Sequence, residues 1–301
     1  MGNSIVVSLL LAGHDVVAVA PLPGEKDTAR TAIEKLLSGA IEEYAPELSW
    51  SACSTRLTVT ESYTDLADCC MVQECVIEDM AIKQKVFSLI EAQVDKHCIL
   101  SSNTSAIPIS TLQGYVRYPE RFLGIHWAEP AFATRFLEIT RGDLTAEQYV
   151  DATVALAAKW NKEPTVLQKD IRGFITNRLM YAVYREALAL IDLGHTTLED
   201  VDQLFQYDLG SWSTFMGPFR RMDYVGIDYY LPILKRLFNE LQTYSHVPQV
   251  MQDAVTAHKR GVHNNDGLYT YQPGEADAWQ YAFEQFNKEI YRLAMKYPEQ
   301  F

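Results

Sequence analysis

Short apolar runs alternate with amphipathic stretches through the first 170 residues, and this alternation limits the possible folds more than any other feature of the chain. The apolar runs have the length and composition of strands, whereas the stretches between them repeat apolar side chains at helical spacing. Strands that alternate with helices along a chain favour right-handed crossovers and a parallel sheet. We predict strands at residues 15–20, 71–77, 98–101, 121–127 and 136–140, and helices at residues 25–43 and 79–94. The sequence therefore predicts a doubly wound α/β domain.

The pattern changes after Lys169. Residues 173–193 form one long segment with an apolar helical stripe, which Gly194 ends, and nearly every later segment has the helical period. Capping boxes mark two further predicted helix starts, at residues 145–148 (TAEQ, opening a helix that runs to residue 161) and 196–199 (TTLE). We therefore predict two domains: an α/β domain at residues 1–170 and an all-α domain at residues 171–301.

Composition excludes several classes of protein. The chain has 301 residues and a formal net charge of −13, which argues against nucleic acid as a partner because duplex binding needs a basic face. No apolar run reaches the length of a membrane span, and no basic segment precedes residues 5–12 as in a signal peptide. The five cysteines are odd in number and match no zinc spacing, so we expect reduced, buried thiols, no metal site and a cytoplasmic protein.

The first 20 residues are unusual. They are similar to the helix, turn and second strand of a Rossmann βαβ unit, whose first strand is followed by a GxGxxG loop. Only Gly2 could correspond to the last glycine of that loop, since the strand and the first two glycines are absent. We therefore expect that the natural protein begins upstream of Met1 and that the absent strand belongs at the centre of the sheet.

Three polar segments occur in an informative order: residues 101–105 (SSNTS) at a strand end, residues 124–138 (GIHWAEPAFATRFLE), and residues 173–178 (GFITNR) at the start of the second domain. Together they resemble the 3-hydroxyacyl-CoA dehydrogenase family, whose motifs are a SNTS turn, a GxH strand with a Glu twelve residues after the His, and a GFxxNR helix start. Further matches are residues 76–87 (VIEDMAIKQKVF), 216–219 (MGPF) with Asp223, 226–228 (GID) and 266–271 (DGLYTY). The resemblance covers nearly the whole chain and implies a Rossmann-type fold with a helical second domain.

The resemblance also implies roles for individual residues. His126 would be the general base that takes the proton of the 3-hydroxyl, and Glu138 would hold the imidazole in the required tautomer. Ser105 and Asn177 would hydrogen-bond the substrate oxygen. The residues that match family positions beside the cofactor are Gly2, Cys75, Glu78, Lys83, Asn103 and Glu129.

The expected cofactor is NAD, with NADP as an open alternative. In NAD-binding Rossmann units an acidic residue ends the second strand and holds the ribose hydroxyls, but this chain has Ala20 there. No basic residue that could favour NADP appears before Lys26.

Several departures from the family pattern bear on the substrate. Glu129 precedes Pro130 where the family usually has Asn, Arg172 stands where it usually has Pro, and residues 261–265 (GVHNN) replace a basic run. The first hypothesis is a dehydrogenase of a CoA-linked L-3-hydroxyacyl substrate. The second is a dehydrogenase of a free 3-hydroxy acid of the sugar-acid or carnitine type, which Glu129 favours. The third is a binding or structural protein that has lost its cofactor.

Apolar side chains are also abundant in the second domain. Residues 181–191, 216–225 and 229–241 carry more of them than a domain of this length normally buries. We therefore expect a homodimer formed through this domain, as the resemblance also implies.

Overall fold

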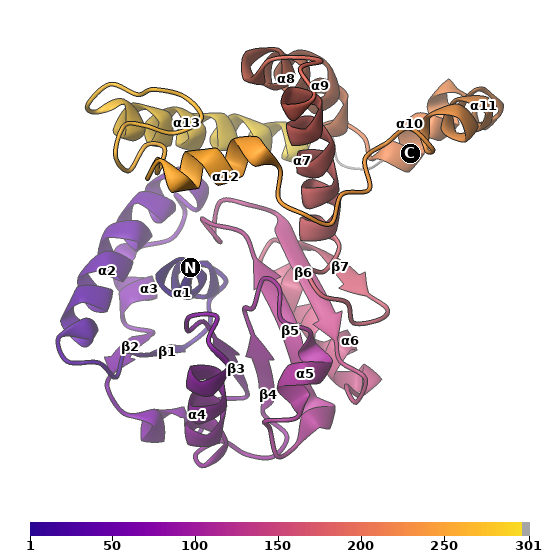
Figure 1. Cartoon of the computed structure of the whole chain (residues 1–301). Helices are drawn as coiled ribbons and strands as arrows, with labels where there is room; N and C mark the ends of the chain where they lie inside the picture. Colours follow the sequence, from indigo (N-terminus) through magenta and orange to yellow (C-terminus); the bar gives the residue numbers. More distant parts are fainter. Residues whose placement is uncertain (297–301) are drawn as a thin grey trace. The chain divides into compact units, whose positions relative to one another are not determined.

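The computed structural model describes residues 1–296 and divides into two compact units (Figure 1). The sheet unit comprises Met1–Asn177 together with the C-terminal segment from Glu284, and the helical unit comprises Arg178–Phe283.

The sheet unit contains two sheets. In the smaller sheet β1 (Val16–Val19) pairs in parallel with β2 (Leu57–Thr60). The larger sheet has the order β3 (Met71–Glu74), β4 (Ile99–Ser102), β5 (Phe122–Trp127), β6 (Phe136–Arg141) and β7 (Glu163–Leu167). The Rossmann-type parallel arrangement is thus confirmed for β1 with β2 and for β3 to β5.

Two strands depart from the predicted parallel sheet. β6 runs antiparallel to β5, and β7 is parallel to β6. The physical reason is the connection at residues 128–135, which is too short for the crossover that two parallel strands require. This reversal brings the last residues of β5 directly opposite β6, where the candidate catalytic pair lies.

The two sheets are separate: among the described residues, β1 has only β2 as a hydrogen-bonded neighbour and β3 has only β4. The additional strand that the sequence predicts before Gly2 stays a prediction.

The helices of the sheet unit are α1 (Gly2–Leu11), α2 (Glu25–Tyr44), α3 (Trp50–Ser54), α4 (Met80–Glu91), α5 (Ile109–Gln113) and α6 (Glu147–Lys159). They form because apolar side chains recur on one face, and α4 is typical: Val86, Phe87 and Ile90 are buried, and the Asp79 side chain caps the first turn by accepting the amide proton of Ile82 at 2.9 Å. Buried clusters around Phe87, Leu100 and Phe122, around Ile125 and Leu137, and around Ile33 and Leu37 form the core of this unit.

The predicted capping box at residues 145–148 is wrong. Ala146 is the N-cap of α6, and no side chain caps this helix. The hydroxyl of Thr145 instead donates to the carbonyl of Phe122 at 2.7 Å and accepts the amide proton of Gly142 at 2.9 Å. A tertiary contact therefore uses the group that the local pattern assigned to the cap.

The helical unit is formed by α7 (Thr176–Asp192), α8 (Leu198–Leu204), a π-helical turn at Phe205–Leu209, α9 (Gly210–Ser213), α10 (Pro218–Val225), α11 (Ile227–Leu237), α12 (Gln249–Thr256) and α13 (Glu275–Lys296), of which α7 and α13 begin or end in the sheet unit. The helical second domain is thus confirmed. Among residues 1–296, no helix has both the length and the apolar character needed to cross a bilayer.

Two helix starts differ from the predictions. α7 begins at Thr176 rather than at residue 173, because Gly173 and Phe174 both have positive φ angles, of 79° and 52°. The N-cap of α8 is Thr197, whose hydroxyl accepts the amide proton of Asp200 at 3.1 Å, so the capping residue is one position later than predicted.

All five cysteines are free thiols, but the expectation that all are buried is wrong: Cys70 is exposed.

Candidate active site

His126 and Glu138 face each other across the antiparallel strands β5 and β6, where they are paired in register. The distance from His126 Nδ1 to Glu138 Oε2 is 3.1 Å. The imidazole is 13% exposed, whereas the carboxylate is 1% exposed. Two residues that lie twelve positions apart in the sequence are therefore direct cross-strand neighbours, with the imidazole on the solvent side of the pair.

The second oxygen of Glu138 is also held. Oε1 accepts the amide protons of Ile175 at 2.8 Å and Thr176 at 3.1 Å, at the N-terminus of α7. Burial tends to raise the pKa of Glu138, but the hydrogen bond to His126 and the two backbone hydrogen bonds outweigh it, so that the pKa lies below its ordinary value. Glu138 is therefore a carboxylate at neutral pH.

A carboxylate beside Nδ1 requires a proton on that nitrogen, and this leaves Nε2 as the basic atom of a neutral imidazole. Among residues 1–296, no group is hydrogen-bonded to His126 Nε2. The rings of Phe136 and Phe174 lie 5.6 and 5.9 Å from the imidazole, measured between ring centroids. They restrict how the imidazole can turn, so the pair has the arrangement of a general base and the group that orients it.

Ser105 and Asn177 lie in contact. Asn177 Nδ2 donates to the backbone carbonyl of Ser105 at 2.6 Å. The Ser105 hydroxyl and Asn177 Oδ1 have no hydrogen-bond partner among the described residues. The two predicted substrate-binding residues are therefore brought together, although through the serine backbone rather than through its hydroxyl.

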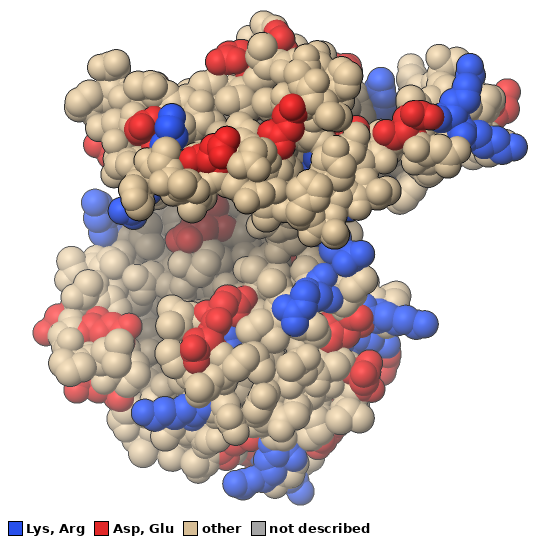
Figure 2. All heavy atoms as spheres, viewed as in Figure 1, with Lys and Arg blue, Asp and Glu red and all other residues tan. Residues whose placement is uncertain are grey.

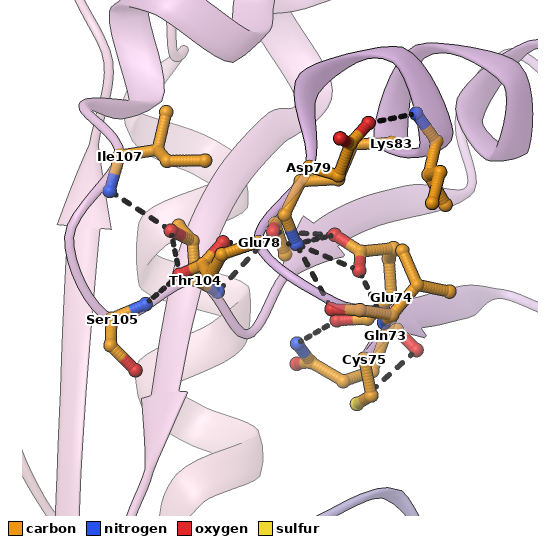
Figure 3. A network of polar contacts seen from close by, with 12 residues as sticks. Gln73, Glu74, Cys75, Glu78, Asp79, Lys83, Thr104, Ser105 and Ile107 are labelled. Carbon is orange, nitrogen blue, oxygen red and sulfur yellow. Dashed lines mark hydrogen bonds and ion pairs between the residues drawn. The ribbon is translucent and has the colours of Figure 1, made fainter. Parts of the chain in front are cut away.

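Glu78 supports the turn that contains Ser105. Its Oε1 accepts the Thr104 hydroxyl proton and the Ser105 amide proton, both at 2.7 Å (Figure 3). Lys83 Nζ lies 3.4 Å from the other oxygen of Glu78. Glu78 thus contacts the turn, and the turn contacts Asn177.

Lys83 is held mainly by Glu74, the last residue of β3. Its Nζ donates to the two carboxylate oxygens of Glu74 at 2.9 and 3.0 Å, and both side chains are buried (Figure 3). Glu74 also accepts the Ser102 hydroxyl proton and the Val76 amide proton, both at 2.6 Å. Glu74 was not among the residues predicted from the sequence, although a carboxylate at a strand end nine residues before a helical lysine is compatible with a buried ion pair.

Asn103, which follows β4, is hydrogen-bonded to the ends of both neighbouring strands, β3 and β5. Its side-chain Oδ1 accepts the amide proton of Trp127 at 3.0 Å, and its backbone amide donates to the Glu74 carbonyl at 2.8 Å. It therefore aligns the carboxyl ends of β3, β4 and β5, the edge at which open α/β sheets bind their ligands.

The remaining predicted residues form a second group at the N-terminus of α1. A Cβ added to Gly2 would lie 3.7 Å from Cys75 Cβ, and the amino group of Met1 is 3.2 Å from Glu129 Oε1. Burial raises the pKa of Cys75 to about 12, so its thiol stays protonated.

The N-terminus of α1 suits the phosphates of a dinucleotide. No side chain caps the helix, and its first turn contains no acidic residue, so the amide protons of that turn are available to an anion. Ala20, which follows β1, offers no carboxylate to the adenosine ribose. The residues present therefore fit a nicotinamide dinucleotide at its phosphates.

Comparison with protein families agrees with this geometry. Residues 1–171 match the model described as 3-hydroxyacyl-CoA dehydrogenase, NAD binding domain, and residues 173–271 match the model described as 3-hydroxyacyl-CoA dehydrogenase, C-terminal domain.

Characterised relatives act on different substrates. The chain is 30% identical over 284 residues to a 5-formyl-3-hydroxy-2-methylpyridine 4-carboxylate 5-dehydrogenase of Mesorhizobium japonicum, covering 93% of this chain and 90% of the relative. It is 30% identical over 274 residues to a 3-hydroxybutyryl-CoA dehydrogenase of Mycobacterium tuberculosis, covering 90% of this chain and 95% of the relative. It is 31% identical over 227 residues to an L-carnitine dehydrogenase of Oceanobacillus iheyensis, covering 75% of this chain and 73% of the relative.

A solved structure extends the first similarity. The crystal structure of a 5-formyl-3-hydroxy-2-methylpyridine 4-carboxylic acid 5-dehydrogenase, described as an NAD+-dependent dismutase, superposes with a TM-score of 0.89 at 28% identity. The superposition covers 97% of this chain and 94% of that chain.

Proposed function

Because the chain belongs to the 3-hydroxyacyl-CoA dehydrogenase family and is an NAD-dependent dehydrogenase, we propose that His126 and Glu138 are its catalytic pair and that its substrate is a free hydroxy acid rather than a CoA thioester. The observation that carries the catalytic assignment is the contact between an imidazole that is 13% exposed and a buried carboxylate that two backbone amides hold in place.

Each of these residues has its own role in the proposed reaction. Nε2 of His126 takes the proton of the substrate hydroxyl, while the Glu138 carboxylate stabilises the imidazolium that forms. The Ser105 hydroxyl and the Asn177 amide hold the substrate oxygen, where negative charge develops. Bound NAD supplies the nicotinamide that accepts the hydride.

The cofactor residues fall into two groups. Gly2 and Cys75 border the dinucleotide at the N-terminus of α1, with the amides of the first helical turn at its phosphates. Glu78, Lys83 and Asn103 act by shaping the strand ends and the turn on which the substrate lies, since Lys83 is buried against Glu74.

Glu129 supports a free substrate. It is an exposed carboxylate three residues after His126 in the chain, in a family whose usual residue there is Asn. A carboxylate there can accept a hydrogen bond from a hydroxyl or an amine of a free substrate, and it attracts a cationic amine. The relatives that act on a free pyridine carboxylate and on carnitine support the same choice.

A second candidate is oxidation of an L-3-hydroxyacyl-CoA to the 3-oxoacyl-CoA, as the sequence first suggested. The similarity to a 3-hydroxybutyryl-CoA dehydrogenase over 90% of this chain favours it.

Steady-state kinetics distinguishes the two candidates. The purified protein with NAD is assayed against 3-hydroxybutyryl-CoA and against a panel of free acids that includes 3-hydroxybutyrate, carnitine and a hydroxymethylpyridine carboxylate. We expect kcat/KM for the best free acid to exceed that for the thioester. The reverse order contradicts the free-acid proposal but leaves the catalytic pair in place, whereas an unchanged turnover in a His126 variant contradicts the pair.

We also propose the division of labour between the domains: residues 1–170 bind the dinucleotide, and residues 171–301 contribute to substrate binding and pair with a second copy of the chain. The helical unit supports such pairing, because Ala189 and Pro248 are the only buried apolar side chains among its described residues.

A further inference from the structure

Lys162, which directly precedes β7, places a charged group inside the sheet unit. The residue is 4% exposed, and its Nζ donates to the backbone carbonyls of Ala131 and Thr134. The same Nζ lies 5.3 Å from the centroid of the Trp127 ring. All three partners belong to the end of β5 or to the connection that follows it.

The ammonium group has no carboxylate to balance it. Among residues 1–296, no Asp or Glu side chain lies within ion-pair distance of Lys162 Nζ. Burial lowers the pKa of Lys162 to about 8. A buried cation without a counter-ion costs folding free energy, even when backbone carbonyls accept its protons. Stabilisation of the fold is therefore a poor explanation for this group.

The connection at residues 128–135 is the segment that Lys162 holds. It joins the strand of His126 to the strand of Glu138, and it contains Glu129. Its first half has other anchors: the Ser4 hydroxyl of α1 accepts the amide proton of Ala131, and the Phe132 ring packs edge-on against Tyr44 of α2, 5.9 Å between centroids.

The second half is held by Lys162 and, at its last residue, by Arg135, whose carbonyl accepts the amide proton of Glu163 at 2.9 Å and whose side chain pairs with the Glu163 carboxylate. The carbonyl contacts of Lys162 reach from Ala131 to Thr134, so the ammonium group spans the turn by which the chain enters β6. Because β6 carries Glu138, any shift of this turn would move the carboxylate relative to the imidazole of β5.

We propose that Lys162 is a positioning residue of the dehydrogenase site, whose ammonium group holds the connection at residues 128–135 and thereby sets Glu129 and the spacing of His126 and Glu138. This inference rests on the proposed function for its catalytic consequence, but the position of the connection itself can be measured without any substrate.

The first test is amide hydrogen exchange in Lys162→Met, with Lys159→Met as the matched control, because Lys159 is exposed and lies three residues earlier. We expect exchange in residues 128–135 to be at least about tenfold faster in Lys162→Met, with α6 unchanged, since loss of the carbonyl contacts promotes local opening. Unchanged exchange in these residues overturns the proposal, and so does faster exchange spread evenly over the sheet unit, which would indicate a purely structural role.

The second test separates positioning from folding by kinetics with NAD and the best substrate. We expect kcat to fall between tenfold and about a hundredfold in Lys162→Met, because small displacements of reacting groups have effects of that size, while Lys159→Met keeps the parent values. The change in kcat should exceed the change in the dissociation constant for NADH, measured by fluorescence.

A rescue experiment completes the test. In Lys162→Ala, propylammonium should restore part of the lost kcat, whereas propanol at the same concentration should not. Faster exchange of the connection with unchanged kcat and KM overturns the positioning role. A parent protein without activity on any substrate of the panel contradicts the proposed function instead, and the exchange comparison then still decides whether Lys162 holds the connection.

Discussion

The two compact units differ in how their apolar side chains are used. The sheet unit buries several complete clusters, in which Phe87, Leu100 and Phe122 are fully inaccessible. The helical unit leaves Phe219 78% exposed and Tyr224 80% exposed. On the face drawn in Figure 2, uncharged side chains cover most of the helical unit.

The two units therefore differ in whether their apolar side chains are buried within the unit itself. The sheet unit contains its own core and the whole candidate catalytic network, from Lys83 to His126. The helical unit has amphipathic helices whose apolar faces are not covered within the unit, and this exposed apolar surface supports the proposed pairing with a second copy of the chain. Substitutions at the candidate site of the sheet unit should therefore change catalysis without changing stability. Substitutions on the exposed apolar faces of the helical unit should instead change the association between copies of the chain.

The largest expected effect concerns chemistry in the sheet unit. His126→Gln should lower kcat by about 10²–10⁴-fold, the usual contribution of a general base, while the unfolding temperature stays unchanged. The matched control is His97→Gln, since His97 is exposed and lies outside the network. Glu138→Gln should also lower kcat, and the double variant should be little worse than His126→Gln because the two residues act as one unit.

Association of the helical unit gives the next effect. Phe219→Asp or Ile227→Asp, which place charge on the exposed apolar faces of α10 and α11, should weaken a homodimer by about 2 kcal/mol or more. Sedimentation at micromolar concentration should show a dimer for the parent and monomer for the variants, with Asn239→Asp, at an exposed polar position, as the control. A monomeric parent protein would contradict the proposal that the exposed apolar faces of the helical unit form a dimer interface.

The pH dependence of the unfolding free energy tests whether Lys162 is a buried ammonium group in the sheet unit. The pKa of Lys162 falls from 10.5 in the unfolded chain to about 8 in the folded protein, so the unfolded state binds more protons between these values and stability rises with pH there. From pH 7 to pH 10, the parent should therefore gain roughly 2 kcal/mol of unfolding free energy relative to Lys162→Met. Denaturant titrations of both proteins at the two pH values measure this difference, and equal changes would contradict a buried ammonium.

The smallest expected effect is on substrate choice. Glu129→Asn should shift the ratio of kcat/KM toward 3-hydroxybutyryl-CoA by about tenfold, because the amide no longer attracts a polar group of a free substrate while His126 and Glu138 stay in place. Stability should not change, since the Glu129 side chain is 61% exposed. An unaltered ratio would exclude Glu129 as a specificity determinant.

Local patterns predicted much of the molecule correctly. Each strand proposed from the short apolar runs exists, because alternation and burial of apolar side chains act over a few neighbouring residues. β2 (LTVT) and β7 (EPTVL) were not predicted because polar residues or proline interrupt their apolar runs, and α3 and α5 were not predicted because five residues carry too little helical periodicity.

The sequence by itself determined the alternation of strands and helices and the family, and it singled out His126 and Glu138 as the candidate pair, since these depend on local periodicity and on motif spacing. The tertiary structure decided that β6 runs antiparallel, and therefore that these two side chains meet across strands. It also decided that Glu74 is buried against Lys83 and that Lys162 is buried against the connection at residues 128–135. Strand direction and burial arise from contacts between distant parts of the chain, and no pattern within one segment encodes them.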